Sequence, residues 1–323
     1  MIKKLLGASA LTLFVLLPTV SSRSAPLVAR DQSLNTPAYA FTHAKHPKIV
    51  VEESKKIGTS RLVRLTYVSM NNQVVPALLF LPASASPHHK VPAVVILHGL
   101  GGNKELMASL ALYFNTFGYA AFAIDEYGAG ERKKQTSTAP SLYSVGSDLL
   151  TGIPQTVVDV RRGVDVLDNN PNIDSKRVGL LGISLGAIIG TIADSWEPRF
   201  KTFVAIAGGG DWKIIMKMFL ANHGEYVGLP NSTLPEETLD LTGIQLHSVD
   251  PAAFAPTLES KSVFMINGAL DHTIAPAAAD ALAKQIDTNT HPYFVRKVLA
   301  DSGHVPSTSI LNPMVKAWLQ RRL

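Results

Sequence analysis

Short apolar runs recur along the chain, and their pattern changes near residue 90. Before that point apolar and polar residues alternate with a period of two, which predicts strands with one exposed face. These runs span 48–53, 62–69 and 74–81, and turn residues such as Asn71-Asn72 separate them. Short neighbouring strands joined by turns indicate an antiparallel opening to a sheet.

From residue 91 onward, fully apolar runs alternate with helical patterns. The expected strands span 91–97, 120–124, 178–183, 202–207, 262–267 and 293–298. The longest helical pattern covers 148–167, and a last one begins near residue 310. Continuous apolar strands are typical of a sheet covered on both faces. The expected fold class is therefore α/β, with a mostly parallel central sheet and helices on both faces.

The first 24 residues have the three-part layout of a secretory signal peptide. Lys3 and Lys4 form a basic start, residues 5–20 are apolar and uncharged, and small residues such as Ser22 and Ser24 follow. A membrane anchor is the alternative, but the apolar run is short for a span and contains a proline. We expect cleavage after one of these serines, export to the periplasm or medium, and no stable membrane anchor afterwards.

Charge and composition exclude several classes of function. The formal net charge is +5, and loss of the signal peptide would bring it to about +2. Basic residues form no block, so nucleic-acid binding has no support. The chain has no cysteine, which excludes disulfides, a lipid-linked cysteine and a thiol nucleophile. The apolar share of 46% is ample for a core.

Motifs for cofactors and metals are also missing. Gly99-Leu100-Gly101 after a strand, with Asp125 ending the next strand, imitates a dinucleotide fingerprint, but the third glycine position holds Lys104. The paired histidines near residues 43–46 and 88–89 have no partner at zinc spacing. We expect neither a cofactor nor a metal.

Gly182-Ile183-Ser184-Leu185-Gly186 is the most informative stretch of the chain. It follows an apolar strand and precedes a helical pattern, which is the setting of a nucleophile elbow. In such a turn the serine hydroxyl is exposed at the sheet edge, and near neighbours must be almost free of side chains. A serine at the start of a tight helix is the alternative interpretation.

Serine needs a base, and the base needs a carboxylate that fixes its tautomer. The chain supplies Ser184, Asp271 and His304 in the order of the α/β-hydrolase triad, each just after an expected strand. Asp211, which also follows a strand, is the main rival to Asp271. We expect His272 to be a loop residue, and Asp301 is a weaker candidate for the acid.

On these motifs the chain resembles an α/β-hydrolase, and is similar to the dienelactone-hydrolase and acetyl-esterase-like secreted hydrolases. The resemblance covers about residues 91–323, and the elbow and the loop His98-Gly99-Leu100-Gly101-Gly102 are its most specific parts. It implies an α/β-hydrolase fold over one catalytic domain, residues 25–323. The nucleophile is cysteine in dienelactone hydrolases and Ser184 here, which favours ordinary ester hydrolysis.

An oxyanion hole needs two backbone N–H donors. We expect the first from Leu185, the residue after the nucleophile. The second is expected from Leu100, because the glycines around it permit close approach of the backbone. On the family pattern, His98 orients this loop and does not act on the substrate.

A helical insertion near residues 212–260 separates two expected strands and is longer than a usual connection. Its first helix carries Trp212 and Met216 on one apolar stripe. These side chains either make a deep core contact or line a pocket for an apolar group, with Tyr127 on an opposite rim that spans 127–144.

The predicted activity is hydrolysis of a small-molecule carboxylic ester by an exported serine hydrolase, through an acyl-enzyme. Peptidases, lipases and thioesterases use the same triad, and fold does not decide among them. A non-catalytic binding protein on a hydrolase scaffold is the alternative from another class. The sequence does not indicate whether the protein is a monomer or an oligomer.

Overall fold

The computed structural model describes most of the chain after its amino-terminal segment. The described residues are Leu34 and residues 37–133, 142–229, 232–260, 262–286, 291 and 293–323. The expected signal peptide, residues 1–24, lies outside them, as does part of the expected 127–144 rim. In the described part, no helix is both long enough and apolar enough to span a bilayer.

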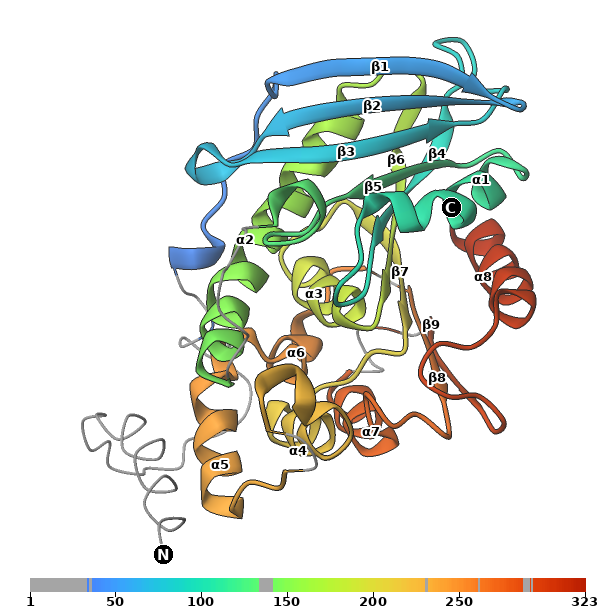
Figure 1. The fold of residues 1–323 in the computed structure, drawn as a ribbon. Coiled ribbons are helices and arrows are strands. Elements are labelled where there is room, and N and C mark those ends of the chain that lie inside the picture. Colours follow the sequence, from blue (N-terminus) through green and yellow to red (C-terminus); the bar gives the residue numbers. More distant parts are fainter. Residues whose placement is uncertain are drawn as a thin grey trace, which may run out of the picture.

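One sheet of nine strands runs through the described part of the molecule (Figure 1). Its order is β1-β2-β3-β5-β4-β6-β7-β8-β9. The strands are β1 (Ile49–Ile57), β2 (Ser60–Val68), β3 (Val74–Leu81), β4 (Val91–Leu97), β5 (Ala120–Ile124), β6 (Ile173–Ile183), β7 (Phe200–Ile206), β8 (Ser262–Gly268) and β9 (Tyr293–Leu299).

The sheet has an antiparallel and a parallel part, as predicted. β1, β2 and β3 pair in antiparallel fashion, and β3 pairs with β5 in the same way. All pairings from β5 through β4 to β9 are parallel. β4 and β5 are buried along their whole length, whereas β1 is exposed except at Ile57. This difference follows from the helices that cover the parallel strands on both faces.

The helices lie on both sides of the sheet (Figure 1). The α-helices are α1 (Ala108–Asn115), α2 (Leu142–Asp168), α3 (Leu185–Asp194), α4 (Trp212–His223), α5 (Glu236–Gln245), α6 (Pro251–Phe254), α7 (Pro276–Gln285) and α8 (Thr308–Arg322). Short 3-10 helices are η3 (Pro37–Tyr39), η4 (Met70–Asn72), η5 (Lys104–Met107), η6 (Gly130–Arg132), η7 (Gly224–Val227), η8 (His247–Val249) and η9 (Ala255–Thr257).

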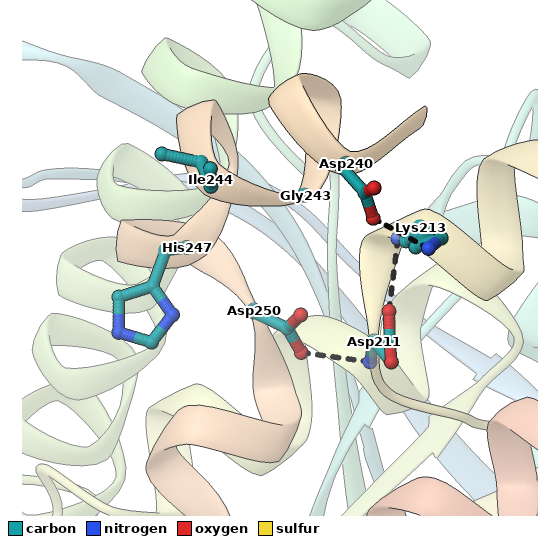
Figure 2. A pocket seen from close by; sticks show the side chains of 7 residues that line it. All are labelled: Asp211, Lys213, Asp240, Gly243, Ile244, His247 and Asp250. Atoms are coloured by element: carbon teal, nitrogen blue, oxygen red, sulfur yellow. Dashed lines mark hydrogen bonds and ion pairs between the residues drawn. The ribbon is translucent and has the colours of Figure 1, made fainter. Parts of the chain in front are cut away.

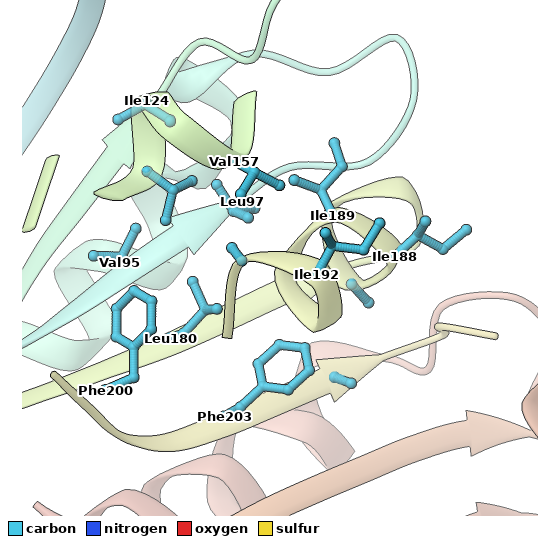
Figure 3. Packing of buried hydrophobic residues seen from close by; sticks show 14 of the residues in the cluster. Val95, Leu97, Ile124, Val157, Leu180, Ile188, Ile189, Ile192, Phe200 and Phe203 are labelled. Atoms are coloured by element: carbon cyan, nitrogen blue, oxygen red, sulfur yellow. The ribbon is translucent and has the colours of Figure 1, made fainter. Parts of the chain in front are cut away.

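Two apolar clusters show which face each helix covers. One joins Val95 of β4 to α2 and α3, through residues such as Val157 and Ile189 (Figure 3). The other joins the adjacent Val94 to Phe114 of α1 and to residues of α8. Successive side chains of a strand point to opposite faces. The sheet therefore lies between two helical layers, and the predicted α/β-hydrolase architecture is confirmed.

The parallel strands give the sheet two edges of different character. The loops that follow β4, β5, β6, β7, β8 and β9 all leave one edge, which we call the carboxyl edge. The segments that lead into these strands lie at the opposite, amino edge. The predicted helical insertion joins β7 to β8 and contains α4, α5 and α6. In Figure 1 these helices gather with α7 at the lower end of the molecule.

Candidate active site

The turn between β6 and α3 has the strained geometry expected of a nucleophile elbow. Ser184 has φ 56° and ψ −118°, a region that residues with a side chain rarely occupy. A Cβ on Gly182 would lie 2.1 Å from the carbonyl oxygen of Gly186. A Cβ on Gly186 would lie 2.4 Å from the carbonyl oxygen of His98. Only glycine fits at either position, and the Ser184 N–H is bonded to Ile206 O at 2.8 Å.

The side chains of Ser184, His304 and Asp271 form one hydrogen-bonded chain. His304 Nε2 lies 2.8 Å from Ser184 Oγ, and His304 Nδ1 lies 2.8 Å from Asp271 Oδ2. A carboxylate can only accept, so Nδ1 carries the proton and Nε2 accepts from the serine hydroxyl. The three residues come from loops after β6, β8 and β9, which meet at the carboxyl edge.

Asp271 is buried and held on both of its oxygens. Oδ2 faces His304, and Oδ1 accepts from the N–H groups of Thr273 and Ile274 at 2.8 and 2.9 Å. The rival Asp211 caps α4 instead, accepting from the N–H groups of Lys213 and Ile214. It is Asp271, and not Asp211, that contacts His304.

The loops that carry Asp271 and His304 are fastened to each other. Ala269 N–H donates to Leu299 O, and Leu270 N–H donates to Ser302 O, both at 2.9 Å. Gly268 lies so close that its Cβ would be 2.0 Å from Gly303 O. The two loops therefore form one unit, which keeps the imidazole and the carboxylate in register.

Gly99, the residue before Leu100 in the expected oxyanion hole, borders Ser184. A Cβ on Gly99 would lie 3.3 Å from the Ser184 Cβ, so the backbone of this loop passes next to the hydroxyl. Neither the Leu100 N–H nor the Leu185 N–H has a hydrogen-bond acceptor among the described residues. For Leu185 this follows from its place in the first turn of α3.

His98 has the contacts of a residue that holds its loop. It is 1% exposed, its Nδ1 lies 2.9 Å from Gly99 O, and Glu126 N–H donates to its Nε2 at 3.3 Å. Burial lowers the pKa of His98, which favours the neutral ring that both contacts require. The burial of this ring makes direct contact with substrate unfavourable.

The expected substrate-binding residues have different environments. Tyr127 is half-buried on the loop after β5, with its N–H bonded to Thr156 and Arg132 over its ring. Trp212 and Met216 are 3% and 4% exposed and belong to the main core cluster. Trp212 Nε1 also donates to Val249 O. For these two residues the structure favours the core contact over the pocket lining.

One described cavity, of about 440 Å³, lies between α4 and α5 (Figure 2). Its lining residues are Asp211, Lys213, Asp240, Gly243, Ile244, His247 and Asp250. None of the three candidate catalytic side chains lines it. Asp250 accepts from the N–H groups of Asp211 and Trp212, and Lys213 pairs with Asp240. The charged side chains that line this cavity therefore hold the first residues of the insertion in place.

A buried ionic cluster beside the candidate site is absent from the sequence-based prediction. Lys104 and Asp125 are both 0% exposed and are bonded to each other. In the sequence, Lys104 attracts attention only as the residue that breaks a glycine fingerprint. Across the described residues, no group of three or more His, Asp or Glu side chains has an arrangement that could hold a metal ion.

A model of the acetyl xylan esterase family, AXE1, matches residues 42–288. YtaP of Bacillus subtilis (strain 168), which is named as a hydrolase, is 24% identical over 156 residues. That match covers 43% of this chain and 51% of YtaP, so the chain spans about half the length of this relative.

Solved structures share the fold over most of the chain. Acetyl xylan esterase 1 from Thermoanaerobacterium sp. JW/SL YS485 has a TM-score of 0.66 at 19% identity, over 90% of this chain and 92% of that one. Acetyl xylan esterase from Paenibacillus sp. R4 has a TM-score of 0.69 at 16% identity, over 91% and 92%. The Pyrococcus furiosus esterase Pf2001 has a TM-score of 0.58 at 18% identity, over 86% of this chain and 99% of that one.

Proposed function

Since the chain belongs to the acetyl xylan esterase family and is a carboxylic ester hydrolase, we propose that it removes acetyl groups from sugars by a Ser-His-Asp mechanism. The observation that carries the proposal is the hydrogen-bonded chain from Ser184 through His304 to Asp271, with both distances 2.8 Å. The substrate is then a small-molecule ester, and the reaction uses no cofactor.

In the first half of the reaction, Ser184 Oγ attacks the carbonyl carbon of the ester while His304 Nε2 takes the hydroxyl proton. The carbonyl oxygen becomes an oxyanion, which accepts hydrogen bonds from the N–H groups of Leu100 and Leu185. The C–O bond to the alcohol then breaks, and His304 returns its proton to the leaving oxygen. An acyl-serine remains.

In the second half, water replaces the alcohol. His304 takes a proton from the water as its oxygen attacks the acyl carbon, and then returns the proton to Ser184 as the acid leaves. Asp271 stabilises the imidazolium in both halves and keeps the proton on Nδ1. Activity is therefore expected to fall in acid, because a protonated His304 cannot act as a base.

The serine assignment has a direct test. Ser184→Ala should lower kcat by at least about 10³-fold while the melting temperature changes little, because the methyl group fills the same space. A fluorophosphonate probe should label the wild type and not this variant, with the label mapped by peptide mass. Wild-type turnover in Ser184→Ala would exclude the serine mechanism and would mean that another group carries the ester hydrolysis.

The choice of ester is a separate question. Rates on p-nitrophenyl esters of increasing acyl length, beside acetylated xylose and xylo-oligosaccharides, would separate an acetyl esterase from a lipase. We expect acetate esters to be the fastest and sugar acetates to be cleaved. A maximum at long acyl chains, or faster cleavage of peptide or thioester analogues, would assign a different substrate.

Tyr127 is proposed to border the substrate site, whereas Trp212 and Met216 act through packing.

We also propose that the chain is exported after removal of residues 1–24. The support is the basic start, the apolar stretch and the small residues that follow. Sequencing of the mature amino terminus in periplasmic and medium fractions should reveal cleavage after Ser22 or Ser24. An uncleaved chain confined to the cytoplasm would contradict export.

A further inference from the structure

The loop that carries Leu100 has little packing of its own. The Leu100 side chain is 72% exposed, and glycines occupy positions 99, 101 and 102 around it. Gly101 has φ 74°, where a residue with a side chain would be strained. One turn hydrogen bond, from the Gly102 N–H to Gly99 O at 2.9 Å, brackets Leu100. A glycine-rich backbone otherwise has many accessible conformations, so contacts at the two ends of the loop help to set its position.

Both ends of this loop are fastened to the residues directly after β5. At the first end, His98 Nε2 accepts the Glu126 N–H. At the other end, the Lys104 N–H donates to Asp125 Oδ1 at 2.9 Å, and Lys104 Nζ donates to Asp125 Oδ2 at 2.8 Å. β4 and β5 are neighbours in the sheet, so the two loops leave the carboxyl edge side by side.

Lys104 is a charged group inside the protein. Its side chain is 0% exposed, and its ammonium also contacts Glu131 and Glu105. Burial acts to lower the pKa of Lys104, but hydrogen bonds to Asp125, Glu131 and Glu105 outweigh it and raise that pKa. The lysine therefore stays protonated and keeps its bonds at neutral pH.

The partner carboxylate is equally confined. Asp125 is 0% exposed and also accepts the Glu131 N–H at 3.0 Å. The chain wraps around it at Gly130, where φ is 53° and a Cβ would lie 2.2 Å from the carboxylate. Replacing a buried ion pair by an apolar pair of similar volume is often neutral or stabilising, so the pair is weak evidence of a stabilising role. The hydrogen bonds between Lys104 and Asp125 do, however, have defined directions, and so they fix the position of the segments that carry them.

We propose that Lys104 and Asp125 are positioning residues, which hold the 98–104 loop so that the Leu100 N–H faces the oxyanion formed at Ser184. This inference rests on the proposed serine mechanism. The pair touches no reacting atom and acts through the backbone of the loop. Its removal should therefore weaken binding of the transition state more than binding of the substrate.

Two variants separate positioning from stability. Lys104→Met keeps the aliphatic stem but leaves Asp125 as a buried unpaired carboxylate, so both kcat and melting temperature should fall. Lys104→Met/Asp125→Asn removes that charge as well, so melting temperature should recover in part. We expect kcat to stay about 10- to 100-fold low in both, with KM within about threefold. Phosphorylation of Ser184 by paraoxon, in which the serine oxygen displaces 4-nitrophenolate from phosphorus, should slow by a similar factor.

Asp165→Asn is the matched control, because Asp165 is also a buried ion-pair partner but lies at the amino edge. It should lower melting temperature without changing kcat. Recovery of kcat together with melting temperature in the double variant would overturn the proposal, as would a loss no larger than in the control. If Lys104→Met does not fold, Glu131→Gln decides: kcat a few-fold lower at unchanged stability supports positioning, and unchanged kcat overturns it. Labelling of wild-type Ser184 tests the serine mechanism independently.

Discussion

Two buried ionic clusters lie at opposite edges of the same sheet, and each holds a different segment of the chain in place. At the carboxyl edge, Lys104 and Asp125 fasten the loop beside Ser184. At the amino edge, Asp165 of α2 pairs with Arg162 at 2.6 Å and with Arg199 at 2.8 Å. It also accepts from Ala44 N–H and contacts His43, and so holds the lead-in chain on the helix.

The comparison shows that burial and charge alone do not identify a functional group. Both carboxylates are nearly inaccessible, and both have cationic partners. They differ in what their partners carry: a glycine-rich loop next to Ser184, the proposed nucleophile, in one case, and a segment far from Ser184 in the other. We therefore expect changes at the carboxyl edge to alter rate, and changes at the amino edge to alter stability.

The largest effect is expected at Asp271. Asp271→Asn should lower kcat by about 10⁴-fold, because an amide neither stabilises the imidazolium nor fixes its tautomer. Asp211→Asn is the matched control at the same edge, since asparagine also caps a helix, and it should cost less than about 1 kcal/mol in stability with kcat unchanged. Steady-state kinetics on p-nitrophenyl acetate measure both. A greater loss of kcat in Asp211→Asn than in Asp271→Asn would identify Asp211, and not Asp271, as the acid of the proposed triad.

At the amino edge, Asp165→Asn should lower the free energy of unfolding by about 3–5 kcal/mol, because Arg162 and Arg199 lose their shared carboxylate. The kcat of the folded variant should stay within about twofold of wild type. Urea denaturation measures the change in the free energy of unfolding, and initial rates at low temperature measure kcat. A loss of kcat comparable to that in Lys104→Met would remove the distinction between the edges.

Leu100→Pro should lower kcat by about 10²–10³-fold, because proline lacks the N–H that is proposed to bind the oxyanion. Leu100→Ala keeps that N–H, and its exposed side chain makes few contacts, so kcat should remain near wild type. Circular dichroism serves as the folding control. Equal rates in the two variants would mean that another donor binds the oxyanion.

The last effect concerns the pH dependence of stability and is expected from Asp194 at the end of α3, near the amino edge. Burial raises its pKa to about 7, although Ser260 donates to it. The folded state therefore binds this proton more tightly than the unfolded chain. The contribution of Asp194 to stability is complete below about pH 4 and is lost as pH rises through about 7, by a few kcal/mol at about 1.4 kcal/mol per pKa unit.

Asp194→Asn should lack this loss, because an amide does not titrate. The difference in melting temperature between wild type and variant, followed from pH 4 to pH 8, should change sign or slope within that window. A constant difference across the whole range would show that Asp194 does not titrate there.

Sequence patterns anticipated the strands and the order of the candidate site residues. The continuous apolar runs of β4 and β5 and the glycines around Ser184 are local features, so they are visible without a fold. Boundaries were less accurate. β6 begins at Ile173 and not at 178, and the apolar pattern missed this start because residues 174–177, which follow Ile173, are polar.

The remaining features depend on contacts between distant segments. Lys104 has the sequence context of a surface lysine, and its burial depends on Asp125, which arrives from the next loop. The core position of Trp212 depends on Val249 O, from the far end of the insertion. The apolar stripe of α4 predicts a buried face but does not say whether a core or a ligand covers it.

Every residue of α3 after Leu185 is buried. A helix enclosed on all sides cannot shift or fray independently, so the amides of its interior should exchange with solvent only when the whole domain unfolds. The elbow is then a fixed point against which the surrounding loops can change. Diversification of this scaffold, by evolution or by engineering, should therefore proceed by exchange of the insertion and the exposed loops while Ser184 remains in place.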